Sequence, residues 1–155
     1  HVPKTDPMKR IFRYLLTAGF LSGFLAISTG SYAQCDTIAS LCTKNLSQKF
    51  ISDGQQYRAL LINNEVAEFT TTFYGGSTYR IIACSGMSEG NLVFRVYDSE
   101  RHILFNSAEY KNAPYWDFKF TSTLNCTIEA QLASTASSGS EEASGCAVVL
   151  VGFKN

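Results

Sequence analysis

The chain has 155 residues, a formal net charge of zero and 17% charged residues. Four of its 13 basic residues but only one of its 13 acidic residues precede residue 34, so the remainder of the chain is acidic. A protein that contacts nucleic-acid phosphates is normally basic, so the composition argues against a nucleic-acid partner.

The N-terminal region has the layout of a secretory signal peptide. Basic residues at 9–13 precede an uncharged, mostly apolar run over 14–27, and the small-residue junction 31–33 follows. The apolar run is shorter than the roughly 20 residues that span a bilayer as a helix, and no second long apolar stretch follows. We therefore expect an exported protein, periplasmic or extracellular, with no integral membrane segment in its mature chain.

This layout divides the chain into three parts. Residues 1–7 precede Met8, the expected natural start, and are interpreted as upstream additions. Residues 8–33 are the predicted signal peptide, and residues 34–155 have the length of a single small domain. Lipid attachment at Cys35 is the less favoured alternative, because the residues one and three positions before it depart from the lipoprotein pattern.

All five cysteines follow the predicted cleavage site: Cys35, Cys42, Cys84, Cys126 and Cys146. Several cysteines in a small exported domain are typical of a disulfide framework. Our first expectation is that Cys35 pairs with Cys42 across a short loop and that Cys84 pairs with Cys126, since both of the latter border predicted strands. The spacing leaves the other pairings open. Without a C-x-x-C pair, and with one histidine after the cleavage site, the sequence predicts no metal site.

Alternation of apolar and polar residues dominates the chain, and no segment shows a convincing helical period. About eight strands are expected, separated by turn-forming residues. This pattern predicts an all-β, antiparallel, disulfide-stabilised sandwich that is jelly-roll-like, with an immunoglobulin-type sandwich as the rival topology. The last predicted strand is almost continuously apolar, as expected of a central strand. The predicted strands cover residues 57–61, 67–73, 79–83, 92–97, 103–106, 115–120, 127–132 and 146–153.

Two sequence stretches carry a family resemblance. Residues 76–81 read GSTYRI, a G-x-x-Y-x-I form, and residues 92–98 read LVFRVYD, followed by Leu104-Phe105. Together they resemble the bacterial pre-peptidase C-terminal domain over residues 65–132. The resemblance implies a secreted jelly-roll module that is not catalytic and that assists secretion, substrate binding or adhesion. Residues 124–128 differ from the repeated G-x-Y of the family's late strand.

Catalytic chemistry has weak support in the sequence. His102 is the one histidine after the cleavage site, and its charged neighbours are typical of a solvated turn. No nucleophile motif accompanies it. A glycosidase needs two carboxylates that face one cleft. The available carboxylates are interpreted as solubilising groups, so a small exported hydrolase is the third hypothesis: Asp98, Glu100, Asp117 and Glu129.

A short loop over residues 110–115 is the candidate ligand-binding segment. It brings together Tyr110, Asn112 and Tyr115, which offer aromatic faces and an amide to a sugar. We therefore predict a non-catalytic binding or adhesion module whose ligand is a glycan. The alternative is a structural or assembly component that binds another exported or cell-surface protein through an open sheet edge or the apolar tail strand. No cofactor is expected, and calcium at residues 98–100 is a weaker hypothesis.

Overall fold

A computed structural model describes residues 30–86, 91–133 and 144–155. Ser31–Asn155 form one unit. Within the described ranges the backbone is mostly strand, as the alternation predicted, with one α-helix and two short 3-10 helices. The strands are β1 (Ile51–Ile62), β2 (Val66–Phe73), β3 (Thr78–Cys84), β4 (Leu92–Tyr97), β5 (Ile103–Asn106), β6 (Tyr115–Lys119), β7 (Leu124–Leu132) and β8 (Ser144–Lys154).

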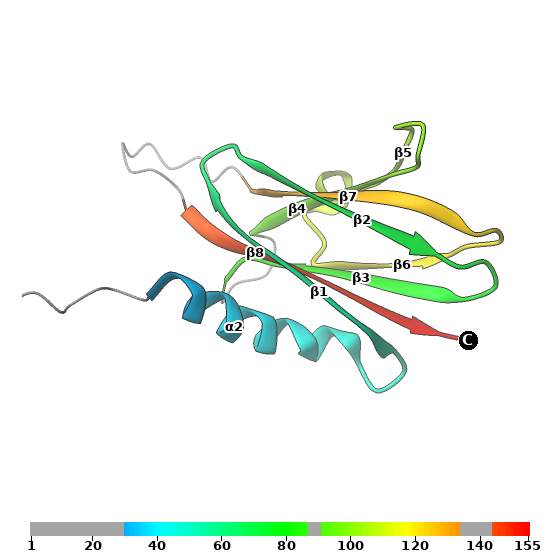
Figure 1. Cartoon of the computed structure of the whole chain (residues 1–155), viewed down its shortest axis with the longest axis horizontal. Coiled ribbons are helices and arrows are strands. Elements are labelled where there is room, and N and C mark those ends of the chain that lie inside the picture. The colour runs from blue at the N-terminus through cyan, green and yellow to red at the C-terminus, as the bar shows by residue number, and fades with distance from the viewer. Residues whose placement is uncertain (1–29, 87–90, 134–143) are drawn as a thin grey trace, which may run out of the picture. The chain divides into compact units, whose positions relative to one another are not determined.

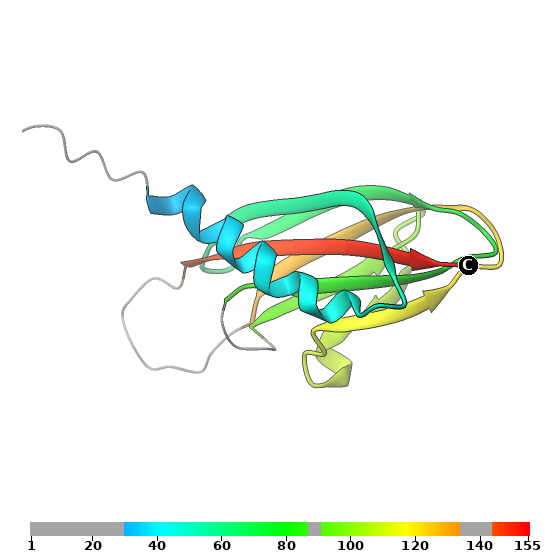
Figure 2. The same ribbon diagram turned by 90° about the horizontal axis from the view of Figure 1, so that it is seen from below.

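The described strands form two four-stranded antiparallel sheets. The strand order is β1-β8-β3-β6 in the first sheet and β2-β7-β4-β5 in the second. Strands 1 and 8, 2 and 7, 3 and 6, and 4 and 5 are paired, as when one long hairpin is rolled up on itself. This is the jelly-roll arrangement rather than the immunoglobulin one. Figures 1 and 2 show the two layers, with β1 and β2 along one open side and β5 and β6 along the other.

Alternate side chains of each strand fill the space between the sheets, which explains the period of two in the sequence. Phe73, Phe94 and Ile128 of the second sheet are fully buried against Ile81 and Val149 of the first. Trp116 packs at the margin of this cluster, as its register predicted. The apolar tail is β8, which lies between β1 and β3, so the prediction of a central strand is confirmed.

Helix α2 (Gly30–Cys42) was not expected from the sequence. It continues into the 3-10 helix η1 (Thr43–Leu46) and covers the outer face of the first sheet, as Figure 2 shows. Its buried side chains pack on Ile82, Val148 and Leu150. The missed signal is the spacing i, i+3, i+4, i+7 of its inward residues, which is the pattern of one helix face. These residues are Cys35, Ile38, Ala39 and Cys42.

The predicted signal peptide, residues 8–33, lies outside the described residues except for 30–33, which begin α2. Residues 1–7 and most of the polar stretch after β7 also lie outside them. Among the residues that are described, no helix is both long and apolar enough to cross a membrane.

The disulfides differ from the expected pairing. Cys35 bonds Cys146 and Cys42 bonds Cys84, while Cys126 is a buried free thiol. Cys35 and Cys42 lie seven residues apart on one helix, a rise of about 10 Å, which a disulfide does not bridge. Cys84 faces α2 on the outside of the first sheet, whereas Cys126 points into the core between the sheets. Both bridges fasten α2 to the sheet, and such bonds are typical of proteins that fold outside the reducing cytosol.

Candidate functional site

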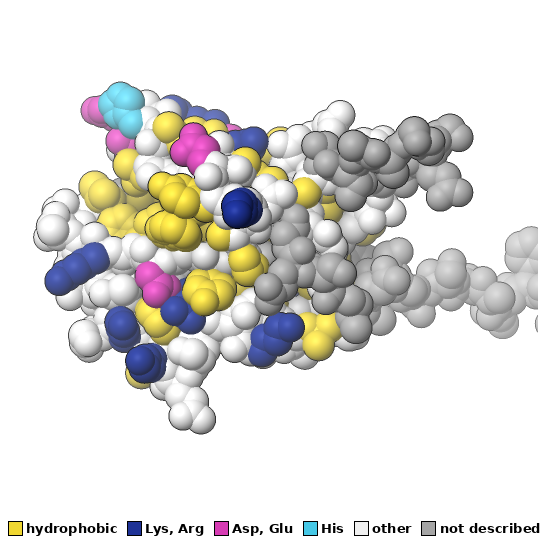
Figure 3. Space-filling model, turned by 180° about the vertical axis from the view of Figure 1, so that it is seen from behind, with side chains coloured by type: hydrophobic (Ala, Val, Ile, Leu, Met, Phe, Trp, Pro, Cys, Tyr) yellow, Lys and Arg dark blue, Asp and Glu magenta, His cyan; other side chains and the backbone are white. Residues whose placement is uncertain are grey.

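One open side of the sandwich carries a group of exposed apolar side chains. The strands β5 and β6 are the outermost strands of their sheets here, and the 3-10 helix η2 (Ser107–Tyr110) connects them. We define the apolar edge as Ile103, Leu104 and Tyr110, whose exposed fractions are 53%, 44% and 48%. Figure 3 looks onto this side and shows hydrophobic side chains gathered together, with acidic and basic groups around them.

The strand β5 presents its side chains through an irregular register. Val96 pairs with Phe105 and Tyr97 pairs with Ile103, so Leu104 is an extra residue in the β5 ladder. Such a bulge bends a strand and redirects the side chain at that position. Leu104 is 44% exposed at this bulge.

Aromatic stacking holds Tyr110 in place on the apolar edge. Its ring stacks on Phe105 at 5.4 Å with 9° between the planes, and its centroid is 4.4 Å from that of Trp116. Phe105 in turn contacts Trp116 at 5.0 Å and Phe118 edge-on at 5.2 Å. Aromatic contacts of this kind contribute about 0.5–1.5 kcal/mol each beyond the area that they bury. The exposed side of Tyr110 is therefore presented on a rigid support.

Hydrogen bonds donated by backbone N–H groups fix the turn that carries Tyr110. The Oδ1 of Asn106 accepts the N–H of Ala108 at 3.1 Å and so caps η2. The buried Ser107 Oγ accepts the N–H of Phe94 at 2.9 Å, which ties η2 to β4. The N–H of Asn112 donates to the carbonyl of Ser107 at 3.0 Å. Both Lys111 and Asn112 have positive φ, and asparagine tolerates that conformation better than most residues.

The structure separates the residues of the predicted sugar loop. Tyr115 lies opposite Ile82 in the register and faces the outside of the first sheet, while Tyr110 packs on the inward ring of Trp116. One face of Tyr110 is covered by Phe105, and the guanidinium of Arg80 lies 4.3 Å from the ring centroid of Tyr115. The two tyrosines therefore do not form one platform with Asn112, and glycan binding at this loop stays a prediction.

Arg80 joins the outer face of the first sheet to the segment before β1. Its guanidinium makes two hydrogen bonds to the Asp117 carboxylate, at 2.7 and 3.0 Å, and a third to the carbonyl of Asn45 at 2.9 Å. It also lies between the rings of Phe50 and Tyr115, at 4.4 and 4.3 Å. The hydrogen bond to Asp117 raises the pKa of Arg80 above its ordinary value. Asp117 thus has a structural partner.

Glu129, another of the candidate carboxylates, also has partners. Burial raises the pKa of Glu129, but hydrogen bonds from Arg101 and Tyr97 outweigh it and hold the pKa below its usual range. Arg101 donates to Glu129 at 2.7 Å and lies 4.5 Å above the ring of Tyr97. This group occupies the outer face of the second sheet. It sets Glu129 beside Glu68, its cross-strand neighbour, with Arg101 between their charges.

The predicted turn at residues 98–102 is built around one carboxylate. Asp98 Oδ1 accepts the N–H groups of His102 at 2.8 Å and of Glu100 at 2.9 Å, and Oδ2 lies 3.1 Å from the His102 ring. The hydrogen bond from the His102 backbone lowers the pKa of Asp98. The His102 side chain is 69% exposed. Across the described part of the chain, no group of three or more acidic, histidine or cysteine side chains is arranged to hold a metal ion.

Comparison with known proteins leaves the family open. No protein-family model and no curated protein matches the chain, so the resemblance to the pre-peptidase C-terminal domain stays a prediction. Among solved structures, the chain is similar to PliG of Aeromonas hydrophila, a periplasmic lysozyme inhibitor of g-type lysozyme. The TM-score is 0.48 and the sequence identity 12%, over 67% of this chain and 91% of that one. A likeness at this level carries no inference about ligands.

Proposed function

We propose that the chain is an exported, non-catalytic module that binds another exported protein through the apolar edge. The observation that carries the proposal is the exposure of Ile103, Leu104 and Tyr110 on β5 and η2, with the Tyr110 ring packed on Phe105 and Trp116. Protein interfaces are enriched in aromatic residues at their centres, and rigidly held aromatic side chains are the ones that contribute most to affinity. The two disulfides support export.

The chemistry of the edge favours a protein over a sugar. Ile103 and Leu104 offer aliphatic surface without hydrogen-bonding groups, which suits the apolar side chains of a partner rather than hydroxyls. Phe105 covers one face of the Tyr110 ring, so a sugar would have a single open face on which to stack. Polar and charged side chains surround the hydrophobic ones on this side, as at the rim of many interfaces, and Glu109 and Lys111 flank Tyr110 in the sequence.

The partner meets side chains rather than a free strand. Strands β5 and β6 are four and five residues long, and β5 is interrupted by its bulge. Short, bulged edge strands resist the addition of another strand. The apolar tail strand that the sequence offered as an alternative contact is not available, because β8 is paired on both sides and buried.

The test is a site-specific cross-link. A photoreactive amino acid placed at position 104 of the exported chain should give one discrete adduct with an exported protein, and that adduct should disappear when Tyr110→Ala is introduced. Loss of a central aromatic contact costs about 2 kcal/mol or more, which weakens binding roughly 30-fold. Tyr110→Ala also removes the ring contacts with Phe105 and Trp116, so the variant should melt several degrees below the wild type, and the cross-link is compared at a temperature where both proteins are folded.

Tyr74→Ala is the matched control. Tyr74 is 63% exposed and lies outside the apolar edge, so this variant should keep the adduct. A cross-link that persists in Tyr110→Ala, or one that joins two copies of this chain, would overturn the proposal. An absent adduct in a correctly folded protein would do the same.

A further inference from the structure

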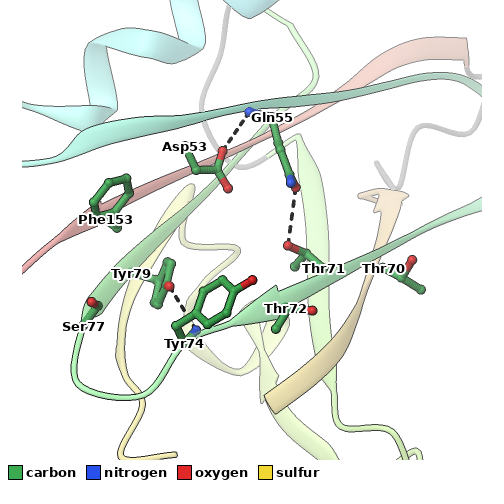
Figure 4. Close-up of a pocket in the computed structure, with 9 residues that line it drawn as sticks. All are labelled: Asp53, Gln55, Thr70, Thr71, Thr72, Tyr74, Ser77, Tyr79 and Phe153. Atoms are coloured by element: carbon green, nitrogen blue, oxygen red, sulfur yellow. Dashed lines mark hydrogen bonds between the residues drawn. The ribbon is translucent and has the colours of Figure 1, made fainter. Parts of the chain in front are cut away.

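A second feature lies on the opposite open side of the sandwich, between the edge strands β1 and β2. It is a cavity of about 620 Å³, within the range of roughly 300–1,000 Å³ that is usual for small-ligand pockets. Figure 4 shows Asp53 and Gln55 of β1 on one wall, Thr71 of β2 opposite Gln55, and the ring of Tyr74 beside them. None of these residues belongs to the apolar edge.

A β-bulge directs two polar side chains into this cavity. The register of β1 against β8 shifts between Ser52 and Gln56, and Gly54 in the middle of the shift has φ +82°. The N–H of Gln55 donates to Asp53 Oδ1 at 2.8 Å, which stabilises the bulge. Asp53 and Gln55 stand on either side of Gly54, and both line the cavity. Bulges occur preferentially next to functional sites, where they re-aim side chains.

The polar groups of the cavity are already held in place. Gln55 Oε1 accepts hydrogen bonds from the Tyr57 hydroxyl and from Thr71 Oγ1, the latter at 3.4 Å, so the amide orientation is fixed. The Tyr79 hydroxyl accepts the N–H of Tyr74 at 3.0 Å, which ties the chain after β2 to the floor of the cavity. Phe153 and Tyr79 supply the apolar part of the lining, with ring centroids 6.4 Å apart.

The composition of the lining defines the class of ligand. Thr71, Ser77, Tyr74 and Tyr79 bring hydroxyl groups to the lining, and the amide of Gln55 and the carboxyl of Asp53 complete the polar set. Thr70 and Thr72 also border the cavity, but Thr72 donates its hydroxyl to Asn125 on the outer face of the second sheet. The lining contains no Lys, Arg or His, so nothing in it neutralises a phosphate, a sulfate or a uronic acid. Asp53 would repel such groups. Burial raises the pKa of Asp53, which is consistent with a carboxyl that is partly withdrawn from water.

We infer that this cavity binds a neutral saccharide, with the ring of Tyr74 against the C–H face of the sugar and Asp53, Gln55 and the Thr71 hydroxyl on its hydroxyl groups. A saccharide has an apolar C–H face and polar hydroxyl groups, and the cavity matches them with a largely exposed aromatic ring and a polar lining. This site is separate from the apolar edge and independent of the function proposed for it.

The experiment probes the exported chain with an array of neutral, uronic-acid and sulfated oligosaccharides, followed by calorimetric titration with the neutral oligosaccharide that binds best. Neutral glycans should bind and the acidic ones should not. Tyr74→Ala and the isosteric Thr71→Val should each weaken binding at least tenfold. Leu60→Ala, at an exposed position of β1 that does not line the cavity, is the control and should bind the sugar as the wild type does.

Three results would overturn the inference. The first is a blank array from a protein that melts cooperatively. The second is a preference for acidic glycans, since the lining has no cation to receive them. The third is sugar binding that survives both Tyr74→Ala and Thr71→Val, which would place the site elsewhere. Thr71→Val keeps the shape of the side chain, so the test does not depend on how Tyr74→Ala folds.

Discussion

Restoring the two disulfides one at a time measures how strongly each stabilises the fold. In a chain whose five cysteines are replaced by alanine, either Cys35 and Cys146 or Cys42 and Cys84 are put back. The first bridge closes a loop of 111 residues and the second a loop of 42 residues. Loop-closure entropy then predicts a stabilisation of about 5 kcal/mol for the first bridge and about 4 kcal/mol for the second.

The assay is equilibrium unfolding in urea, followed through the fluorescence of Trp116, which is the only tryptophan of the chain. Each restored variant is measured both oxidised and in reductant. The reduced form has the same side chains without the covalent bond, so it controls for their packing. The difference between the two curves isolates the covalent bond. Coincident curves would refute the idea that the bridges stabilise the domain. A larger effect from the shorter loop would show that contacts beneath α2, rather than chain entropy, determine the gain.

Further predictions follow from single residues. Phe94→Ala, at a fully buried position, should lower the free energy of unfolding by about 3–5 kcal/mol in urea titrations. The Cys126 thiol, whose pKa burial raises, should resist iodoacetamide at pH 8 until urea unfolds the protein. The pKa of Asp98 is lowered in the folded protein, so its contribution is present above the unfolded pKa and lost as pH falls through the folded one. Asp98→Ala should therefore lower the melting temperature at pH 7 but not in strong acid.

Alternation along the chain was enough to predict the strands and their inward faces, because burial between two sheets imposes a period of two on every strand. It did not predict the first half of β1, where Ser52, Asp53 and Gly54 interrupt the pattern. The structure explains the interruption as a bulge that directs Asp53 into a cavity. The local irregularity that obscured the strand is therefore part of the candidate saccharide site.

Features that depend on distant contacts were beyond the sequence. The disulfide partners are set by how α2 lies on the first sheet, which brings Cys35 to Cys146 across most of the chain. The helix itself was missed because its few apolar residues stand among polar ones and follow a predicted signal peptide. The apolar edge was not predicted, although Tyr110 was singled out as part of a sugar-binding loop. The contacts of the Tyr110 ring with Phe105 and Trp116 could not be predicted, because they form only when the two sheets pack together.

The central position of β8 has a consequence for the order in which the protein is assembled during export. Strands β1 and β3 are not neighbours, so the first sheet has no continuous ladder until β8, which follows every other described strand in the sequence, is inserted between them. The disulfide of Cys35 likewise cannot form until Cys146 is present. A chain that crosses a membrane N-terminus first would remain open and sensitive to proteases until its last strand arrived. Completion of translocation, rather than local strand formation, would then set the moment of folding.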